Sequence, residues 1–312
     1  MLFLFVLLLS LTGMLKAQVT TAGMSGKVMA DEESVIGATV VAVHEPSGTS
    51  YGTVTNVDGR FSLQGMRSGG PYKVTVSYIG YQTAIYTDIQ LQLGETYSLN
   101  VTLHEASELL GEITITASKS KFSAEKTGAT TNISSEQLTT LPSINRSISD
   151  FTRISPYASG NSFGGRDGRS NTFTVDGANL NNNFGLSSGL PGGGNPISLD
   201  AIDEVQVVIA PYDVRQANFI GAGINAITKS GTNAYRGSAY MYFNNEVMRG
   251  NKIGDTDFGV RAEESKTVYG ATFGGPIIKD KLFFFANVEY EKSPQQVVKW
   301  RAAQEGETPN SS

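Results

Sequence analysis

Between residues 22 and 103 apolar and polar positions alternate in short runs, which is the pattern of half-buried β-strands. The clearest run has four apolar positions separated by single polar ones: Tyr72, Val74, Val76 and Tyr78. No helical period of 3.6 residues occurs in this stretch. The pattern predicts about seven short strands, the number found in a small antiparallel β-sandwich. The clearest of them are 23–30, 37–45, 49–55, 60–63, 72–78 and 99–103.

One turn in this stretch has a specific chemistry. Asn56-Val57-Asp58-Gly59 separates two of the predicted strands, and its Asp-Gly pair supplies the positive φ of a tight turn. We therefore predict a β-hairpin formed by residues 49–55 and 60–63. Because the turn accounts for Asp58, this carboxylate is not assigned to a calcium site.

An isolated strand pattern follows at residues 111–118, where isoleucine and threonine alternate. Its flanks, 105–108 and 119–121, are polar and charged, so no partner strand is evident nearby in the sequence. Two interpretations are open. The stretch can be an edge strand of the preceding sandwich, or it can be a docking strand that joins another protein through backbone hydrogen bonds.

A looser region extends from residue 119 to residue 231. Ser134 and Gln137 have the spacing of a capping box, which predicts a short helix that ends before Pro142. Three apolar residues then fall at helical spacing before Pro156: Ile144, Ile148 and Phe151. A zone rich in glycine and asparagine occupies residues 159–195. Strands are predicted at 171–177, 202–209 and 221–229.

The last part of the chain alternates over longer runs. Tyr235 to Asn244 is one such run, and Leu282 to Glu291 is a clearer one. In the second run Leu282, Phe284, Ala286, Val288 and Tyr290 are predicted to face lipid, and the residues between them water. An earlier strand, 267–273, connects to it through a turn in 274–281. The pattern favours the strands of a transmembrane β-barrel over a soluble meander.

Composition narrows the class of protein. Charged residues make up 17% of the chain and glycine is abundant, with 35 residues, which favours a turn-rich, extracytoplasmic β-protein. The net charge of −5 and the lack of a basic cluster argue against nucleic-acid binding. There is no cysteine, and His44 and His104 are the only histidines. Thiolate metal sites and disulfides are excluded, and a histidine-based catalytic site has little material.

The N-terminus predicts export. An almost unbroken apolar run covers Leu2 to Leu15, too short to span a bilayer, and Ala17-Gln18 provides a small-residue cleavage point. We predict a signal peptide over residues 1–17, although no lysine or arginine precedes the run. A retained membrane anchor is the alternative.

Several motifs in the sandwich region resemble the carboxypeptidase regulatory-like domain. They are Ser25-Gly26-Lys27-Val28, Ile36-Gly37-Ala38-Thr39-Val40, the segment 52–63 and Tyr78-Ile79-Gly80-Tyr81. The resemblance implies a prealbumin-like β-sandwich, and carbohydrate binding is often inferred for such domains. No convergent aromatic platform is visible, so Tyr78 and Tyr81 are interpreted as packing residues.

Other motifs resemble the plug domain of TonB-dependent outer-membrane receptors. They are Phe163-Gly164-Gly165-Arg166 before the Thr-Val-Asp-Gly strand end, the stretch 202–209 and the segment 223–231. With a plug in view, the stretch Glu112, Ile113, Thr114, Ile115, Thr116 and Ala117 resembles a TonB box. The run 274–285 resembles that of Oar-like receptors, which also carry an extra N-terminal sandwich.

These resemblances imply a mainly β protein with a sandwich, an α+β plug and the first strands of a truncated barrel. The expected divisions are 1–17 signal peptide, 18–105 sandwich, 106–119 linker with the TonB box, 120–231 plug and 232–312 barrel start. Too few strands follow residue 231 to close a barrel, and an open edge in lipid leaves backbone groups unpaired, so we expect a fragment of a longer receptor.

The function implied is TonB-energised uptake of an extracellular substrate across the outer membrane of a Gram-negative cell, with the sandwich and box in the periplasm. The expected partners are TonB with its inner-membrane coupling proteins, outer-membrane lipid and an unidentified substrate. Candidate substrate contacts in the plug loops are Phe163, Arg166, Arg169, Asn181, Asn182 and Asn183.

Two other classes of function stay open at this point. A secreted β-sandwich module could bind carbohydrate or act as an adhesin without transport. An enzyme is suggested only by the name of the carboxypeptidase regulatory-like domain. Since His44 and His104 lack the spacing of zinc ligands, no catalytic residue, metal or cofactor is predicted.

Overall fold

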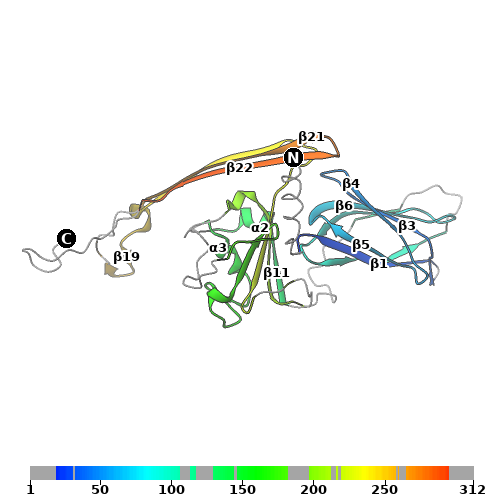
Figure 1. The fold of residues 1–312 in the computed structure, drawn as a ribbon, viewed down its shortest axis with the longest axis horizontal. Helices are drawn as coiled ribbons and strands as arrows, with labels where there is room; N and C mark the ends of the chain where they lie inside the picture. The colour runs from blue at the N-terminus through cyan, green and yellow to red at the C-terminus, as the bar shows by residue number, and fades with distance from the viewer. Residues whose placement is uncertain are drawn as a thin grey trace, which may run out of the picture. The chain divides into compact units, whose positions relative to one another are not determined.

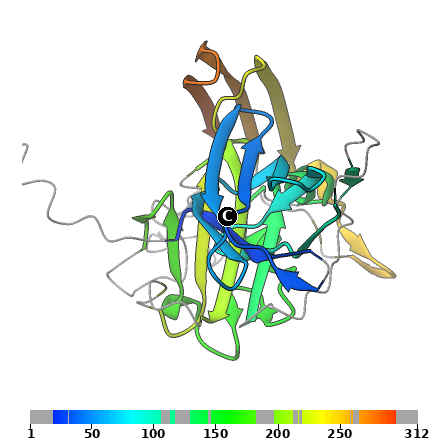
Figure 2. The same ribbon diagram turned by 90° about the vertical axis from the view of Figure 1, so that its right-hand side faces the viewer.

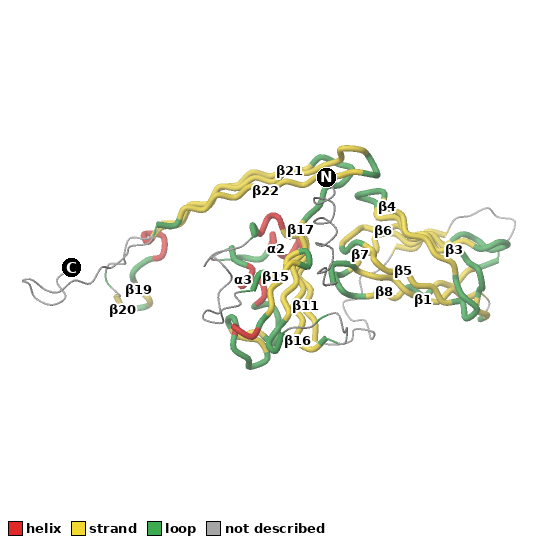
Figure 3. Tube along the Cα trace, viewed as in Figure 1, coloured by secondary structure: helices red, strands yellow, loops and turns green. Residues whose placement is uncertain are grey.

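The computed structural model describes residues 19–30, 32–105, 113–116, 129–143, 146–181, 197–211, 216, 219–257, 259 and 265–294. Strands dominate the regular structure of these residues, and helices are few and short (Figure 3). No helix in these ranges is long and apolar enough to cross a membrane. The chain forms two compact units, residues 1–236 with 274–285 and residues 237–273 with 286–312.

The larger unit begins with a sandwich of two five-stranded sheets (Figure 1, Figure 2). In one sheet β1 is central, with β2 and β5 antiparallel to it and β8 and β9 parallel to it. The other sheet has the order β10-β7-β6-β3-β4. The strands are β1 (Ala22–Ala30), β2 (Glu33–Ser34), β3 (Thr39–His44), β4 (Thr49–Val54), β5 (Arg60–Met66), β6 (Gly69–Ser77), β7 (Ala84–Leu91), β8 (Thr96–Ser98), β9 (Val101–Leu103) and β10 (Ile113–Thr116).

The predicted hairpin of residues 49–55 and 60–63 is wrong. β4 pairs with β3, whereas β5 pairs with β1 in the other sheet. The turn itself forms, because Gly59 has a φ of 73° and donates its N–H to the Asn56 carbonyl at 2.9 Å. It carries the chain from one sheet to the other. The sandwich is also mixed rather than purely antiparallel, since β8, β9 and β10 each pair in parallel.

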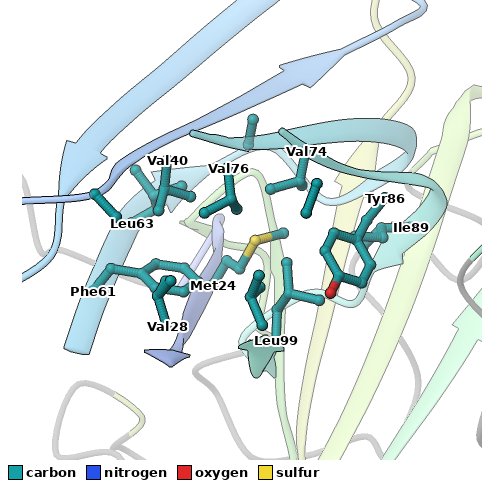
Figure 4. Close-up of a cluster of buried hydrophobic side chains, with 14 of the residues drawn as sticks. Met24, Val28, Val40, Phe61, Leu63, Val74, Val76, Tyr86, Ile89 and Leu99 are labelled. Atoms are coloured by element: carbon teal, nitrogen blue, oxygen red, sulfur yellow. The ribbon is translucent and has the colours of Figure 1, made fainter. Parts of the chain in front are cut away.

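The core lies between the two sheets, and Met24 of β1 is fully buried among aliphatic and aromatic side chains (Figure 4). Of the four alternating positions in β6, Tyr72, Val74 and Val76 are fully buried as predicted. Tyr78, the fourth position of the run, is 36% exposed. The reason is that β6 ends at Ser77, and Tyr78 starts a turn in which its ring pairs with that of Tyr81 at 5.6 Å.

A second part of the larger unit is a five-stranded sheet with the order β11-β16-β17-β14-β15. Buried side chains of the sheet pack with those of the helices α2 and α3 in a separate core. The elements are β11 (Ala129–Ser134), α2 (Ser135–Thr140), α3 (Ile148–Thr152), β12 (Ala158–Ser159), β13 (Ser162–Phe163), η2 (Gly168–Ser170), β14 (Thr172–Val175), β15 (Ala178–Asn179), η4 (Leu199–Ala201), β16 (Ile202–Ala210) and β17 (Gly223–Thr228).

The predicted helices form, although both are short. Gln137 accepts the Ser134 N–H at 3.0 Å through its side-chain oxygen, as the capping box requires, and α2 ends before Pro142. Helix α3 begins only at Ile148, and Ile144 lies outside the described residues. Ile148 and Phe151 are buried, as their spacing predicted.

The last part is a three-stranded sheet with the order β18-β21-β22. β21 continues to Ile278, so most of the predicted connection 274–281 is strand, and the turn lies at Lys279-Asp280, where Asp280 has a φ of 61°. The elements are β18 (Arg236–Asn245), η5 (Glu246–Arg249), β19 (Lys252–Ile253), β20 (Thr256–Asp257), β21 (Ser265–Ile278) and β22 (Leu282–Lys292).

A close backbone approach in the sandwich predicts a sensitive position. A Cβ atom at Gly26 of β1 would overlap the carbonyl oxygen of Leu99, whereas one at Gly52 of β4 would lie 4.0 Å from its nearest neighbour, the Val40 carbonyl oxygen. We expect Gly26→Ala to lower the free energy of unfolding by about 1–3 kcal/mol. Gly52→Ala should change it by less than about 1 kcal/mol. Denaturant unfolding of the two variants tests this, and equal stabilities would contradict it.

Burial of His44 in β3 makes the sandwich sensitive to acid. The side chain is 4% exposed, and its Nδ1 lies 2.7 Å from the Ser47 hydroxyl. Burial, with a smaller contribution from the charge of Arg67, lowers the pKa of His44 from 6.5 to about 4. Between these values the unfolded chain binds a proton on His44 that the folded sandwich does not bind.

We therefore expect the stability of residues 18–105, whose core cluster lies within the sandwich, to be greatest above about pH 6.5 and to fall as the pH drops toward 4. His44→Gln should remove this part of the pH dependence. His104→Gln, at the exposed histidine, should keep it. Urea unfolding at several pH values measures the difference, and an unchanged pH dependence in His44→Gln would contradict the assignment.

Candidate functional site

The stretch predicted as a TonB box is an edge strand of the sandwich. β10 pairs in parallel with β7, with the register Ile113 to Ala84 and Thr116 to Thr87. Of the two interpretations of this stretch, the edge-strand arrangement is the one observed. Glu112 and Ala117 lie outside the described residues, so the box is seen over four of its six positions.

The sandwich thus gains a strand from the stretch expected to be a linker, residues 106–119. β10 is the outermost strand of the second sheet, and within the described ranges nothing pairs with its far side. The backbone groups on that side are arranged as in any edge strand, ready to pair with another chain. Being an edge strand and serving as a docking strand are compatible, and the docking role stays a prediction.

The four described candidates for substrate contact in the predicted plug differ in their exposure. Phe163 is 1% exposed and packs in the core of the second part, so its assignment as a contact is wrong. The apolar core that its neighbours form was not visible in the motif. Asn181 is half-buried, and its side chain accepts the Phe173 N–H at 2.6 Å and donates to the Thr172 hydroxyl at 3.2 Å. It closes the turn after β14, which is a structural role.

Two of the six candidates are exposed side chains. Arg166 follows the short β12–β13 pair, and Arg169 lies in η2, where its Nε is 3.3 Å from Asp167. The Asp167 side chain also accepts the Arg169 N–H at 2.8 Å, which holds this turn in place. Asn182 and Asn183 lie outside the described residues. The arginines are thus the cationic groups that the loop 164–170 presents to solvent.

A row of polar residues across the second sheet was missed by sequence reasoning. Cross-strand register joins Asn132 to Gln206, Gln206 to Asn225 and Asn225 to Thr174. Thr174 donates to Asn225 at 2.7 Å, and Asn225 donates to Gln206 at 3.4 Å. In the sequence each of these polar residues stands next to an apolar residue that is buried on the opposite face. The alternation of polar and apolar positions could therefore have predicted this polar row.

Glu204 lies two residues before Gln206 on the same face of β16 and is 6% exposed. Both of its carboxylate oxygens accept the Leu93 N–H at 3.1 Å. Burial raises the pKa of Glu204 to about 7, and the Leu93 hydrogen bond opposes that rise. Glu204 and Gln206 thus have partners, as buried polar groups require, whereas the buried Oδ1 of Asn132 accepts no hydrogen bond within the described residues.

The three-stranded sheet has two chemically different faces. One carries exposed large apolar side chains: Met241, Phe243, Tyr269, Phe273, Val288 and Tyr290. Alternate positions carry polar pairs. Tyr240 donates to Glu289 at 2.6 Å, Ser238 lies 2.6 Å from Thr272, and Lys266 pairs with Glu291 at 3.0 Å. An exposed apolar face of this kind marks an interaction surface.

The described part of the chain contains no candidate metal site. Within the described residues no three histidine, aspartate or glutamate side chains gather in a way that could hold a metal ion. Asp58 lies in the turn described above, where its N–H donates to the Asn56 side chain at 3.0 Å.

Two parts of the chain match known families. Residues 23–104, the sandwich without β10, match the carboxypeptidase regulatory-like domain. Residues 227–302, which include β18, β21 and β22, match the outer membrane beta barrel domain. The first match accounts for the fold of the sandwich, and the second for the two-faced sheet.

The chain is also similar to a curated transporter. It is 26% identical over 252 residues to the TonB-dependent transporter Oar of Myxococcus xanthus, and the alignment covers 75% of this chain and 23% of Oar. The chain thus spans about a quarter of the length of that relative.

Solved structures give weaker likenesses. The siderophore receptor PirA of Acinetobacter baumannii aligns with 53% of this chain and 24% of its own length, at 23% identity and a TM-score of 0.39. PirA of Pseudomonas aeruginosa aligns with 54% of this chain and 28% of its own length, at 19% identity and a TM-score of 0.40. TM-scores this low carry no conclusion about the fold.

By sequence, therefore, the chain is a homologue of the TonB-dependent transporter Oar that carries a carboxypeptidase regulatory-like domain and a match to the outer membrane beta barrel domain.

Proposed function

We propose that this chain is part of a TonB-dependent outer-membrane receptor and that uptake begins when a strand of TonB pairs with the box Glu112 to Ala117. The observation that carries the proposal is β10, a strand with one edge open, placed between the sandwich and the predicted plug, residues 120–231. Recognition by strand addition uses main-chain hydrogen bonds, so it needs an accessible edge more than particular side chains. Similarity to Oar supports TonB as the partner.

The membrane assignment is supported by the three-stranded sheet. Its exposed apolar side chains, among them Val288 and Tyr290, suit the hydrocarbon of a bilayer, and the alternating polar pairs suit a hydrated lumen. Further strands must pair with the outer edges of this sheet before it can lie in lipid, because unpaired backbone groups are costly there. We infer that the sandwich and box face the periplasm.

Substrate contact is the least specified step. Of the candidates in the predicted plug, Arg166 and Arg169 are the exposed cationic groups. We infer that they contact the substrate, or the barrel loops around it, from the plug side. Their charge favours an anionic group on the substrate. Transport moves a substrate without a chemical reaction, so the proposed function needs no catalytic residue.

The box assignment predicts a loss of partner binding on proline substitution. Ile115→Pro removes a backbone donor and fixes φ in the centre of β10, and it should abolish binding to the periplasmic domain of TonB in a pull-down. Ile115→Val keeps the backbone and should bind like the parent chain. Full affinity in Ile115→Pro would show that the box is elsewhere.

The two-faced sheet predicts an asymmetric response to charge. In a receptor whose further strands complete this sheet, Val288→Arg places a charge on the apolar face and should weaken association with phospholipid vesicles by about 2–4 kcal/mol if the side chain reaches the bilayer midplane. Asn287→Arg, on the opposite face of β22, should have a much smaller effect. Vesicle flotation measures both. Equal losses would contradict a lipid-facing role for the Val288 face.

A further inference from the structure

The outer edge of β7 is the place where the box strand β10 pairs with the sandwich. β6 pairs with one side of β7, and β10 pairs with the other side along Ala84 to Thr87. β7 continues to Leu91, so half of its outer side lies beyond β10.

β7 has an irregularity directly after Thr87, the last of these register partners. Between the register pairs Tyr86–Val74 and Ile89–Tyr72, two residues of β7 oppose the single residue Lys73 of β6. Asp88, one of the two, is exposed and has a φ of 61°. A bulge with a charged residue ends a regular edge and blocks further strand addition. The regular part of the β7 edge beside β10 therefore ends at Thr87.

The chain just before the box is tied to the same edge. Gln82 donates its N–H to the His104 carbonyl at 2.8 Å, and Tyr81 forms a bridge with Glu105. These contacts lie immediately before β7 begins at Ala84. The chain thus leaves the sandwich core beside the start of β7, which favours the parallel register in which β10 docks.

From these contacts we propose that the carboxypeptidase regulatory-like sandwich presents the box to TonB, as a preformed edge strand to which the TonB strand adds while β10 stays paired with β7. The partner surface is the open side of β10, and the product is a sheet extended by one strand beyond the order β10-β7-β6-β3-β4. This inference rests on the proposed function, because it takes TonB as the strand that is added.

Presentation has a thermodynamic consequence. A free peptide must order its backbone when it pairs, and that conformational entropy is lost on binding. A strand already held by β7 has lost that freedom on folding, so preorganisation raises its affinity for the added strand. The 312-residue chain should bind TonB on the order of tenfold or more tightly than a peptide of residues 106–120.

A disulfide lock tests whether β10 stays on β7. The chain has no cysteine, so Thr87→Cys with Thr116→Cys introduces the only two thiols, at positions that are register partners. Neighbouring strands are about 4.8 Å apart, within the Cα separation that a disulfide spans. We expect the disulfide to form in the folded chain, and the oxidised chain to bind the TonB periplasmic domain at least as tightly as the reduced chain. Each single cysteine variant serves as a control.

The outcomes separate the two proposals. If the reduced chain and the peptide bind but the oxidised chain loses more than about tenfold in affinity, β10 must leave β7, and presentation is wrong. The same holds if the disulfide does not form, or if the peptide binds as tightly as the chain. If neither chain nor peptide binds TonB, the box assignment itself fails.

Discussion

Backbone pairing at the edge of a sheet is the interaction on which the functional reading of this chain depends. The four-residue strand β10 has no core of its own, and its position is set by parallel pairing with β7. β7 has a bulge at Asp88, just after the paired residues, and the contacts of Gln82 and Tyr81 hold the chain beside the start of β7. β10 pairs with the outer edge of β7, and the far side of β10 becomes the new edge of the sheet.

The sandwich gives this edge a rigid support. Its core is continuous between the two sheets, with Met24, Val40 of β3 and both valines of β6 fully buried. Strands β3 and β6 lie behind β7 in the same sheet, so force or strain applied at β10 is passed to a packed body rather than to a loop. A domain of this kind suits the presentation of a peptide strand, and it needs no ligand pocket for that task.

The fold was predictable from the sequence where period and turn chemistry agree. β6 and β22 follow their alternation, β16 forms over the stretch predicted as a strand, and the capping box of Ser134 and Gln137 starts α2. Pairing was less predictable. The Asp-Gly turn at Gly59 forms, yet it joins two sheets, because alternation reports which face is buried and not which strand lies next to it. The partner of β10 was missed for the same reason, since parallel neighbours are distant in sequence. The candidate site was predicted only in part. A sequence motif carries no information about burial, so Phe163 was taken for a surface residue.

The most direct test of the central claim is hydrogen exchange along β7 and β10 in the free chain and in its complex with the periplasmic domain of TonB. If the sandwich presents the box, the amides of Ala84 to Thr87 keep their protection when TonB binds, and those of Ile113 to Thr116 gain protection on the side that β7 leaves open. Faster exchange at Ala84 to Thr87 on TonB binding would show that β10 is removed from β7, and would contradict the account.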